Sequence, residues 1–98
     1  MARFSGKVAI VTGSSNGIGR ATAVLLASEG AQVTITGRDS ARLEDTRQAI
    51  LKEGVSEANV NAIVVDVTSP DGLDLLISST VAKFGKLNIL EVIEVLLC

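Results

Sequence analysis

The sequence predicts an α/β fold, in which helices cover both faces of a doubly wound parallel sheet. Two observations lead to this prediction. Short runs of apolar, mostly β-branched residues alternate with longer segments in which apolar residues recur at helical spacing, and glycines stand at the junctions. The resulting order is β-α-β-α-β-α-β. Such an alternation implies parallel strands joined by right-handed crossovers, for which we expect the spatial order 3-2-1-4.

Length and composition favour one small domain. The 98 residues allow a single domain, residues 1–98. A domain of this size buries only about 60–70% of the surface of its unfolded chain, so its stability margin is thin. Apolar residues make up 47% of the sequence, which excludes a disordered chain. Because only Phe4 and Phe84 are aromatic, the core must be built from aliphatic side chains, as in buried parallel strands.

Charge and cysteine content exclude several classes of protein. The net charge is −2 and the basic residues are scattered, so neither nucleic acid nor a membrane is expected as a partner. Cys98 is the one cysteine, which excludes a disulfide framework within the chain and favours a reducing, cytoplasmic compartment. The apolar run near the start is too short to span a bilayer. We expect no targeting signal and no metal site.

The first strand and helix are predicted from residue type and spacing. Residues 8–11 form an apolar, β-branched run that ends at Thr12, as expected for a strand buried on both faces. A glycine-rich turn follows over residues 13–19. From Ile18 onward, small or apolar residues recur at helical spacing, and Gly30 ends the predicted helix.

The second unit follows the same plan. Residues 33–36 read as a strand, after which Asp39 or Ser40 is expected to cap a helix that ends at Gly54. A polar loop leads to Asn59. The side chains expected on the inner face of this helix are Leu43, Ile50 and Leu51.

The third unit begins with a strand over residues 62–65, followed by Asp66. Ser69 is a good helix cap, and proline at the next position suits the first turn of a helix. Gly85 is expected to close this helix, and residues 87–90 begin a fourth strand. The residues that share one face of the predicted helix are Leu73, Leu76, Ile77, Thr80 and Phe84.

The glycine-rich turn lies where a diphosphate needs access to the backbone. Glycines allow a sharp turn and let phosphate oxygens approach main-chain amides, while the helix start contributes about half a positive charge. We expect Gly13 to make the turn, Gly17 to permit the close approach and Gly19 to let the helix pack near the strand. Arg20 follows where a P-loop needs lysine, so a P-loop is excluded. The alternative is a turn that uses glycine for geometry alone.

Residues 12–20 resemble the TGxxxGIG signature of short-chain dehydrogenases/reductases. The resemblance continues through residues 37–39, 66–68 and 84–90 and covers about residues 5–90. It implies a partial Rossmann fold and the NAD(P)(H)-binding portion of an oxidoreductase that acts on alcohol or carbonyl groups. The residues that it assigns to the cofactor are Gly13, Ser15, Asn16, Gly17, Ile18, Gly19, Arg38, Asp66 and Val67.

The end of the second strand bears on the choice between NADP and NAD. A carboxylate there favours NAD through the ribose hydroxyls, whereas an arginine accommodates a 2′-phosphate. Arg38 favours NADP(H), although Asp39 follows at once and leaves NAD open unless it caps the helix. A solvated loop arginine is the alternative for Arg38. By resemblance Asp66 accepts from the adenine amino group, with Val67 beside it; a turn or cap carboxylate is the alternative.

The catalytic residues of the family have no counterpart here. Its members use a Tyr-x-x-x-Lys pair and an upstream serine, but this sequence contains no tyrosine. The front-half serines do not match the catalytic one, and the lysines (Lys7, Lys52, Lys83, Lys86) lie in other contexts. We therefore assign no catalytic residue. The chain is expected to be the nucleotide-binding portion of an oxidoreductase and not to turn over substrate as these 98 residues. The alternative is a truncated isoform without oxidoreductase activity, which either binds only or has no function.

The resemblance ends after Leu90. The family reads Asn-Asn-Ala-Gly shortly beyond this position, whereas residues 91–98 form a divergent, largely apolar tail. The tail is expected to extend the fourth strand or to form a short helix. A fourth strand without a neighbour would leave an open sheet edge, which favours self-association.

Overall fold

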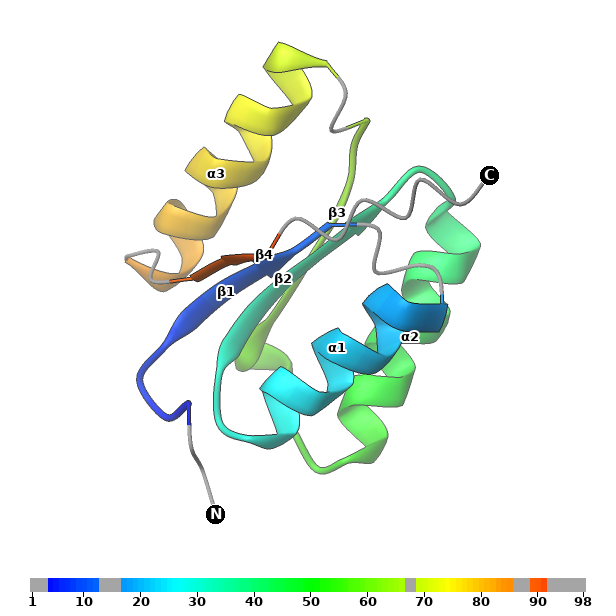
Figure 1. Ribbon diagram of the computed structural model, residues 1–98, viewed down its shortest axis with the longest axis vertical. Helices are drawn as coiled ribbons and strands as arrows, with labels where there is room; N and C mark the ends of the chain where they lie inside the picture. The colour runs from blue at the N-terminus through cyan, green and yellow to red at the C-terminus, as the bar shows by residue number, and fades with distance from the viewer. Residues whose placement is uncertain (1–3, 13–16, 67–68, 86–88, 92–98) are drawn as a thin grey trace.

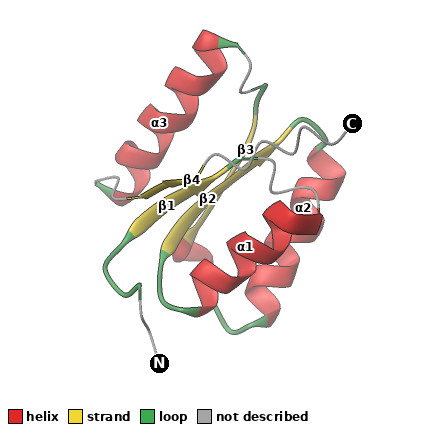
Figure 2. Ribbon diagram, viewed as in Figure 1, coloured by secondary structure: helices red, strands yellow, loops and turns green. Residues whose placement is uncertain are grey.

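The computed structural model describes residues 4–12, 17–66, 69–85 and 89–91, the last three by their backbone alone. Its four strands form one parallel sheet in the order β3-β2-β1-β4. Helices α1 and α2 lie on one face of this sheet and α3 lies on the other (Figure 1, Figure 2). The predicted α/β fold is therefore confirmed. In chain order the elements are β1 (Val8–Val11), α1 (Gly17–Ser28), β2 (Gln32–Gly37), α2 (Ser40–Lys52), a 3-10 turn (Glu57–Asn59), β3 (Val60–Val64), α3 (Pro70–Phe84) and β4 (Ile89–Glu91).

β2 is one residue longer at each end than predicted, and β3 and β4 also differ from the sequence prediction, because pairing, not residue type, sets strand boundaries. β3 begins at Val60, where it pairs with Val33 of β2, and so starts two residues before the predicted strand. β4 overlaps the prediction at residues 89–90 and includes Glu91, which pairs with Val11. The rest of the predicted fourth strand, residues 87–88, and the tail from 92 to 98 lie outside the described residues.

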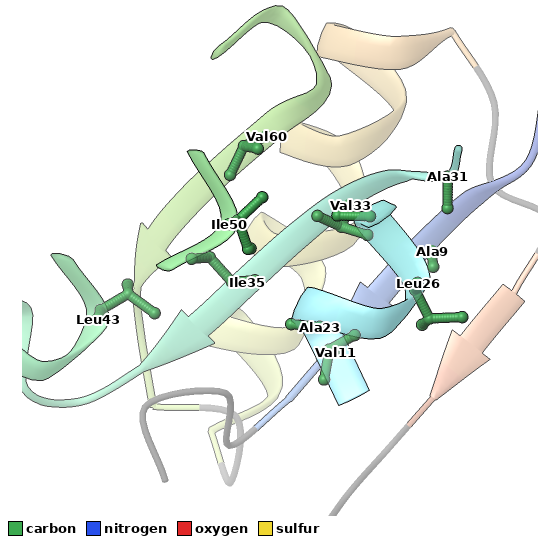
Figure 3. Close-up of a cluster of buried hydrophobic side chains, with 11 residues drawn as sticks. Ala9, Val11, Ala23, Leu26, Ala31, Val33, Ile35, Leu43, Ile50 and Val60 are labelled. Atoms are coloured by element: carbon green, nitrogen blue, oxygen red, sulfur yellow. The ribbon is translucent and has the colours of Figure 1, made fainter. Parts of the chain in front are cut away.

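The main core lies between the sheet and the α1/α2 layer (Figure 3). β1 is buried along its whole length, as predicted for a strand covered on both faces. Alternate residues of β1 (Ala9, Val11) and of β2 (Val33, Ile35) belong to this core, and Ile35 is completely buried. Small residues of α1 let this helix pack close to the sheet. The cluster consists of Ala9, Val11, Ala23, Leu26, Ala27, Ala31, Val33, Ile35, Leu43, Ile50 and Val60.

On the opposite face of the sheet, the buried residues of α3 are the apolar Leu76 and the polar Thr80. Thr80 Oγ1 lies 2.7 Å from Thr34 Oγ1 and 2.8 Å from the carbonyl oxygen of Leu76. Asn61 Nδ2 donates to Thr34 Oγ1 at 3.3 Å and to Ser79 Oγ at 3.2 Å. Thr34 and Thr80 are fully buried, so these mutual contacts satisfy hydroxyls that would otherwise destabilise the interface.

Local signals in the sequence define the helix ends. Asp39, and not Ser40, caps α2. Ser69 caps α3 with Pro70 in its first turn, and Gly85 ends α3 in the left-handed conformation at φ 83°. Gly30 follows α1 with φ 97°. These assignments confirm the predicted caps, and each of the three helices is the next helix in the chain after a strand. Within the described ranges, no helix combines the length and apolarity that a bilayer crossing requires.

Candidate functional site

The candidate site lies along the carboxyl edge of the sheet. In a parallel sheet all strands end at the same edge, which is where open α/β sheets bind their ligands. Val11 of β1 pairs with Ile35 of β2, and Gly37 of β2 pairs with Val64 of β3. Neighbouring strands are about 4.8 Å apart, so the segments that follow these three strands form a row about 10 Å long.

The three chain segments that include the predicted site residues follow the strands in a defined order. The glycine-rich turn follows β1, Arg38 follows β2 and Asp66 follows β3. Since the sheet order is β3-β2-β1, Arg38 lies between the other two positions. Of the nine predicted residues, the structure describes Gly17, Ile18, Gly19, Arg38 and Asp66. Gly13, Ser15, Asn16 and Val67 lie outside the described residues.

The glycine-rich turn occupies the predicted strand-to-helix junction. β1 ends at Val11 and α1 begins at Gly17, so the turn connects the central part of the sheet to a helix start. Gly19 is buried, as expected for a position where the helix approaches the sheet. Ile18 is 61% exposed, which leaves an apolar side chain at the helix start uncovered by the described part of the chain.

Gly17 is a glycine that the described protein atoms do not require. A Cβ atom built on it would meet nothing within 4 Å. Gly17 is also absent from the glycines with positive φ, so any residue could adopt its backbone conformation. Neither packing nor backbone geometry accounts for glycine here. Among the described residues, Gly17 therefore faces open space at the start of α1.

The electrostatics of the helix start suit an anion. The first turn of α1 carries no acidic residue, so the partial positive charge of its amides is not neutralised from within that turn. Arg20 lies in the same turn, but its guanidinium is used elsewhere. Arg20 Nε donates to Thr46 Oγ1 at 2.9 Å, and Nη2 donates to the carbonyl oxygen of Arg42 at 3.3 Å.

The Arg20 contacts join the start of α1 to the first half of α2. Sequence reasoning used Arg20 only to exclude a P-loop and missed this role. The partner Thr46 lies 26 residues away, so no local pattern could have indicated the contact. Arg20 thus links the start of α1 to α2, the helix that follows Arg38 in the chain.

Arg38 and Asp39 have different roles in the structure. Asp39 Oδ1 accepts from the backbone amides of Ala41 at 3.0 Å and Arg42 at 3.2 Å. Asp39 Oδ2 lies 3.8 Å from Arg42 Nε. The carboxylate is therefore turned toward α2 as its cap. Arg38 is exposed, and its side chain forms no ion pair with a residue that the structure describes.

Asp66 is part of the turn between β3 and α3. Its carbonyl oxygen accepts from the amide of Ser69 at 3.2 Å, and its side chain is exposed at the edge of the sheet. The cap of α3 is Ser69, whose hydroxyl accepts from the amide of Gly72 at 3.3 Å. The carboxylate of Asp66 is thus not the helix cap, one of the two alternatives to a ligand role.

The fold and this edge define a class of protein: an α/β domain that presents a glycine-rich turn, a basic residue and an acidic residue on successive strand ends. The residues fit an anionic nucleotide, because there is open space at Gly17, a helix start without acid and an arginine without an ion pair in the described ranges.

A family model described as short chain dehydrogenase matches residues 7–93 of this sequence. The chain therefore belongs to the short-chain dehydrogenase family, a family of oxidoreductases that use nicotinamide dinucleotide cofactors.

Solved structures share both the fold and much of the sequence. A glucose dehydrogenase of Caenorhabditis elegans in its apo form is 68% identical, with a TM-score of 0.89 over 90% of this chain and 37% of that one. A short-chain dehydrogenase/reductase of unknown function from the same organism, solved with cofactor, is 65% identical, with a TM-score of 0.88 over 90% and 32%.

Among curated proteins, a levodione reductase of Leifsonia aquatica is 36% identical over 86 residues, which is 88% of this chain and 32% of the relative. An uncharacterized oxidoreductase of Staphylococcus saprophyticus is 40% identical over 90 residues, covering 92% and 38%. The chain thus spans about a third of the length of the relatives that it matches.

Proposed function

We propose that this chain is the NADP(H)-binding portion of a short-chain oxidoreductase and that its 98 residues hold the nucleotide without performing the hydride transfer. The observation that carries the proposal is the open space over Gly17 at the start of α1, in a chain whose family uses nicotinamide dinucleotides. A diphosphate placed there would meet main-chain amides and the positive end of the helix dipole. Gly13, Ser15, Asn16 and Ile18 would complete this part of the site.

The proposed preference for NADP rests on the different contacts that the side chains of Arg38 and Asp39 make. A guanidinium that has no ion pair in the described chain is available for charge-assisted hydrogen bonds to a 2′-phosphate. The Asp39 carboxylate, which would otherwise favour NAD, accepts from two amides of α2 and points along that helix. The adenine would then lie toward β3, where Asp66 accepts from its amino group and Val67 lies beside it.

The proposal that no turnover occurs rests on chemistry that the sequence lacks. The cofactor would supply the hydride, and the protein must supply a proton donor and a substrate pocket. The sequence contains no tyrosine and no histidine. Relatives are named as a glucose dehydrogenase and a levodione reductase and are about three times as long, which supports an activity of complete family members on alcohol or carbonyl groups.

Titration with NADPH tests the proposal. We expect a saturable change in NADPH fluorescence with the wild-type chain and a loss of about 5- to 150-fold in affinity for Gly17→Ala, because a methyl group would occupy the space of the phosphate. Alanine at a helix start does not lower helix propensity, so the free energy of unfolding should be unchanged or slightly higher. The matched control is Ser28→Ala at the other end of α1, which should leave the affinity unchanged.

The result separates the proposal from its alternatives. A chain with a folded circular dichroism spectrum but no saturable signal would contradict nucleotide binding. An unfolded spectrum would favour a non-functional chain. Oxidation of NADPH by the 98-residue chain in the presence of a carbonyl substrate would contradict the absence of turnover.

The capping role of Asp39 predicts that two substitutions at this position differ in their effect on stability. Asp39→Ala should lower the free energy of unfolding by about 1 kcal/mol, because two amides of α2 lose their acceptor. Asp39→Asn should leave stability nearly unchanged, because asparagine is an equally good cap. It should also raise NADPH affinity about two- to fivefold, because a negative charge beside the 2′-phosphate is removed.

Urea unfolding and NADPH titration of both Asp39 variants check this prediction. The effect of Asp39→Asn on affinity should diminish at high salt, since the charge is exposed. A gain of NADH affinity in place of NADPH affinity would show that the carboxylate does not oppose a phosphate.

A further inference from the structure

Gly72, in the first turn of α3, packs directly against the backbone of Asp66. A Cβ atom built on Gly72 would lie 2.2 Å from the carbonyl oxygen of Asp66 and 3.1 Å from its carbonyl carbon. Real Cβ atoms essentially never come closer than 3.0 Å to another heavy atom. Both neighbours are backbone atoms, so no flexible side chain can move aside. Glycine at position 72 is therefore required by this contact.

Hydrogen bonds fix the chain on both sides of Asp66, the residue that Gly72 contacts. On the strand side, the amide of Val65 donates to the carbonyl oxygen of Gly37 at 3.2 Å. On the helix side, the amide of Ser69 donates to the carbonyl oxygen of Asp66 at 3.2 Å, and the hydroxyl of Ser69 accepts from the amide of Gly72 at 3.3 Å. The position of Asp66 is thus set by how closely the first turn of α3 docks against the end of β3.

From this geometry we infer that Gly72 is a positioning residue for the adenine end of the nucleotide site. The inference rests on the proposed function, in which the carboxylate of Asp66 accepts from the adenine amino group. Any larger side chain at position 72 must push the start of α3 away from Asp66 by most of an ångström. Because Asp66 and Ser69 are joined by a hydrogen bond, that displacement moves the carboxylate relative to the row of strand ends.

A comparison of NADPH with its hypoxanthine analogue, in which a carbonyl oxygen replaces the adenine amino group, tests this inference. The wild-type chain should bind NADPH at least about tenfold more tightly than the analogue, because only adenine has an exocyclic amino group that donates to the carboxylate, whereas the analogue presents a carbonyl oxygen there. In Gly72→Ala this preference should fall to about onefold to threefold. A purely structural role for Gly72 would weaken both ligands equally and would leave the ratio unchanged.

Two further variants keep the test decisive. Ser69→Ala removes the hydroxyl that holds the amide of Gly72 without adding bulk, and it should also lower the ratio even if Gly72→Ala does not fold. The matched control is Gly85→Ala, which strains the opposite end of α3 at φ 83° and should keep the wild-type ratio.

Each outcome has one meaning. A full wild-type preference retained in both Gly72→Ala and Ser69→Ala overturns the positioning role. A wild-type chain that binds NADPH and the analogue equally also overturns it, while nucleotide binding itself stands. A wild-type chain that binds neither ligand contradicts the proposed function and, with it, this inference.

Discussion

Replacing Arg38 by aspartate is expected to weaken NADPH binding by at least about 100-fold while leaving NADH binding within about threefold of the wild-type value. A charge-assisted hydrogen bond is worth about 1.5–3 kcal/mol, and each 1.4 kcal/mol corresponds to about tenfold in affinity. Aspartate adds repulsion of the 2′-phosphate to the loss of this bond. NADH lacks that phosphate, so the change removes nothing that it uses.

The measurement is a pair of fluorescence titrations with NADPH and NADH at two salt concentrations. The matched control is Lys52→Asp, which makes the same change of charge in the last turn of α2, away from the carboxyl edge of the sheet. Equal losses of NADPH and NADH affinity in Arg38→Asp would remove the assignment of Arg38 to the 2′-phosphate. A similar loss of NADPH affinity in the control would show that net charge alone is responsible.

Replacing Ile35 by alanine is expected to lower the free energy of unfolding by about 2–5 kcal/mol. Ile35 is completely buried in the central strand β2, where it contributes to the cluster under α1 and α2. Its truncation removes apolar contacts and leaves a cavity that the surrounding strands cannot fill. Small domains have about 5–15 kcal/mol of total stability, so this one change removes a large part of it.

Urea unfolding followed by circular dichroism measures the effect. Val64→Ala is the matched control, because Val64 is also β-branched and lies in a strand but is 52% exposed at the sheet edge. We expect that control to cost less than about 1 kcal/mol. NADPH at 100 times its dissociation constant should restore about 2.7 kcal/mol to Ile35→Ala. Equal losses in the two variants would contradict the assigned core.

Local signals accounted for the elements and their ends. Ser69 and Pro70 start α3, Gly85 ends it, and the apolar run of β1 is buried throughout, as its composition predicts. These features depend on residues within one or two turns of the chain. The order of the elements, together with the rules for parallel sheets, was therefore readable without any long-range contact.

The carboxyl-edge location of the candidate site was also readable, since Gly17, Arg38 and Asp66 each follow a predicted strand. The role of Asp39 was not. Asp39 and Ser40 were equally plausible caps from residue type alone. Only the structure shows that the Asp39 carboxylate turns toward α2 as its cap, and so has a different role from the neighbouring Arg38.

Taken alone, the sequence determined the fold class, the family resemblance and the sheet edge at which a ligand would bind, because these follow from short patterns that the backbone obeys locally. Only the tertiary structure decided the contacts across elements. Thr80 meets Thr34 across 46 residues, Arg20 meets Thr46 across 26, and Gly72 packs on Asp66. Such contacts depend on the distances at which helices dock on the sheet, and no pattern along the chain encodes those distances.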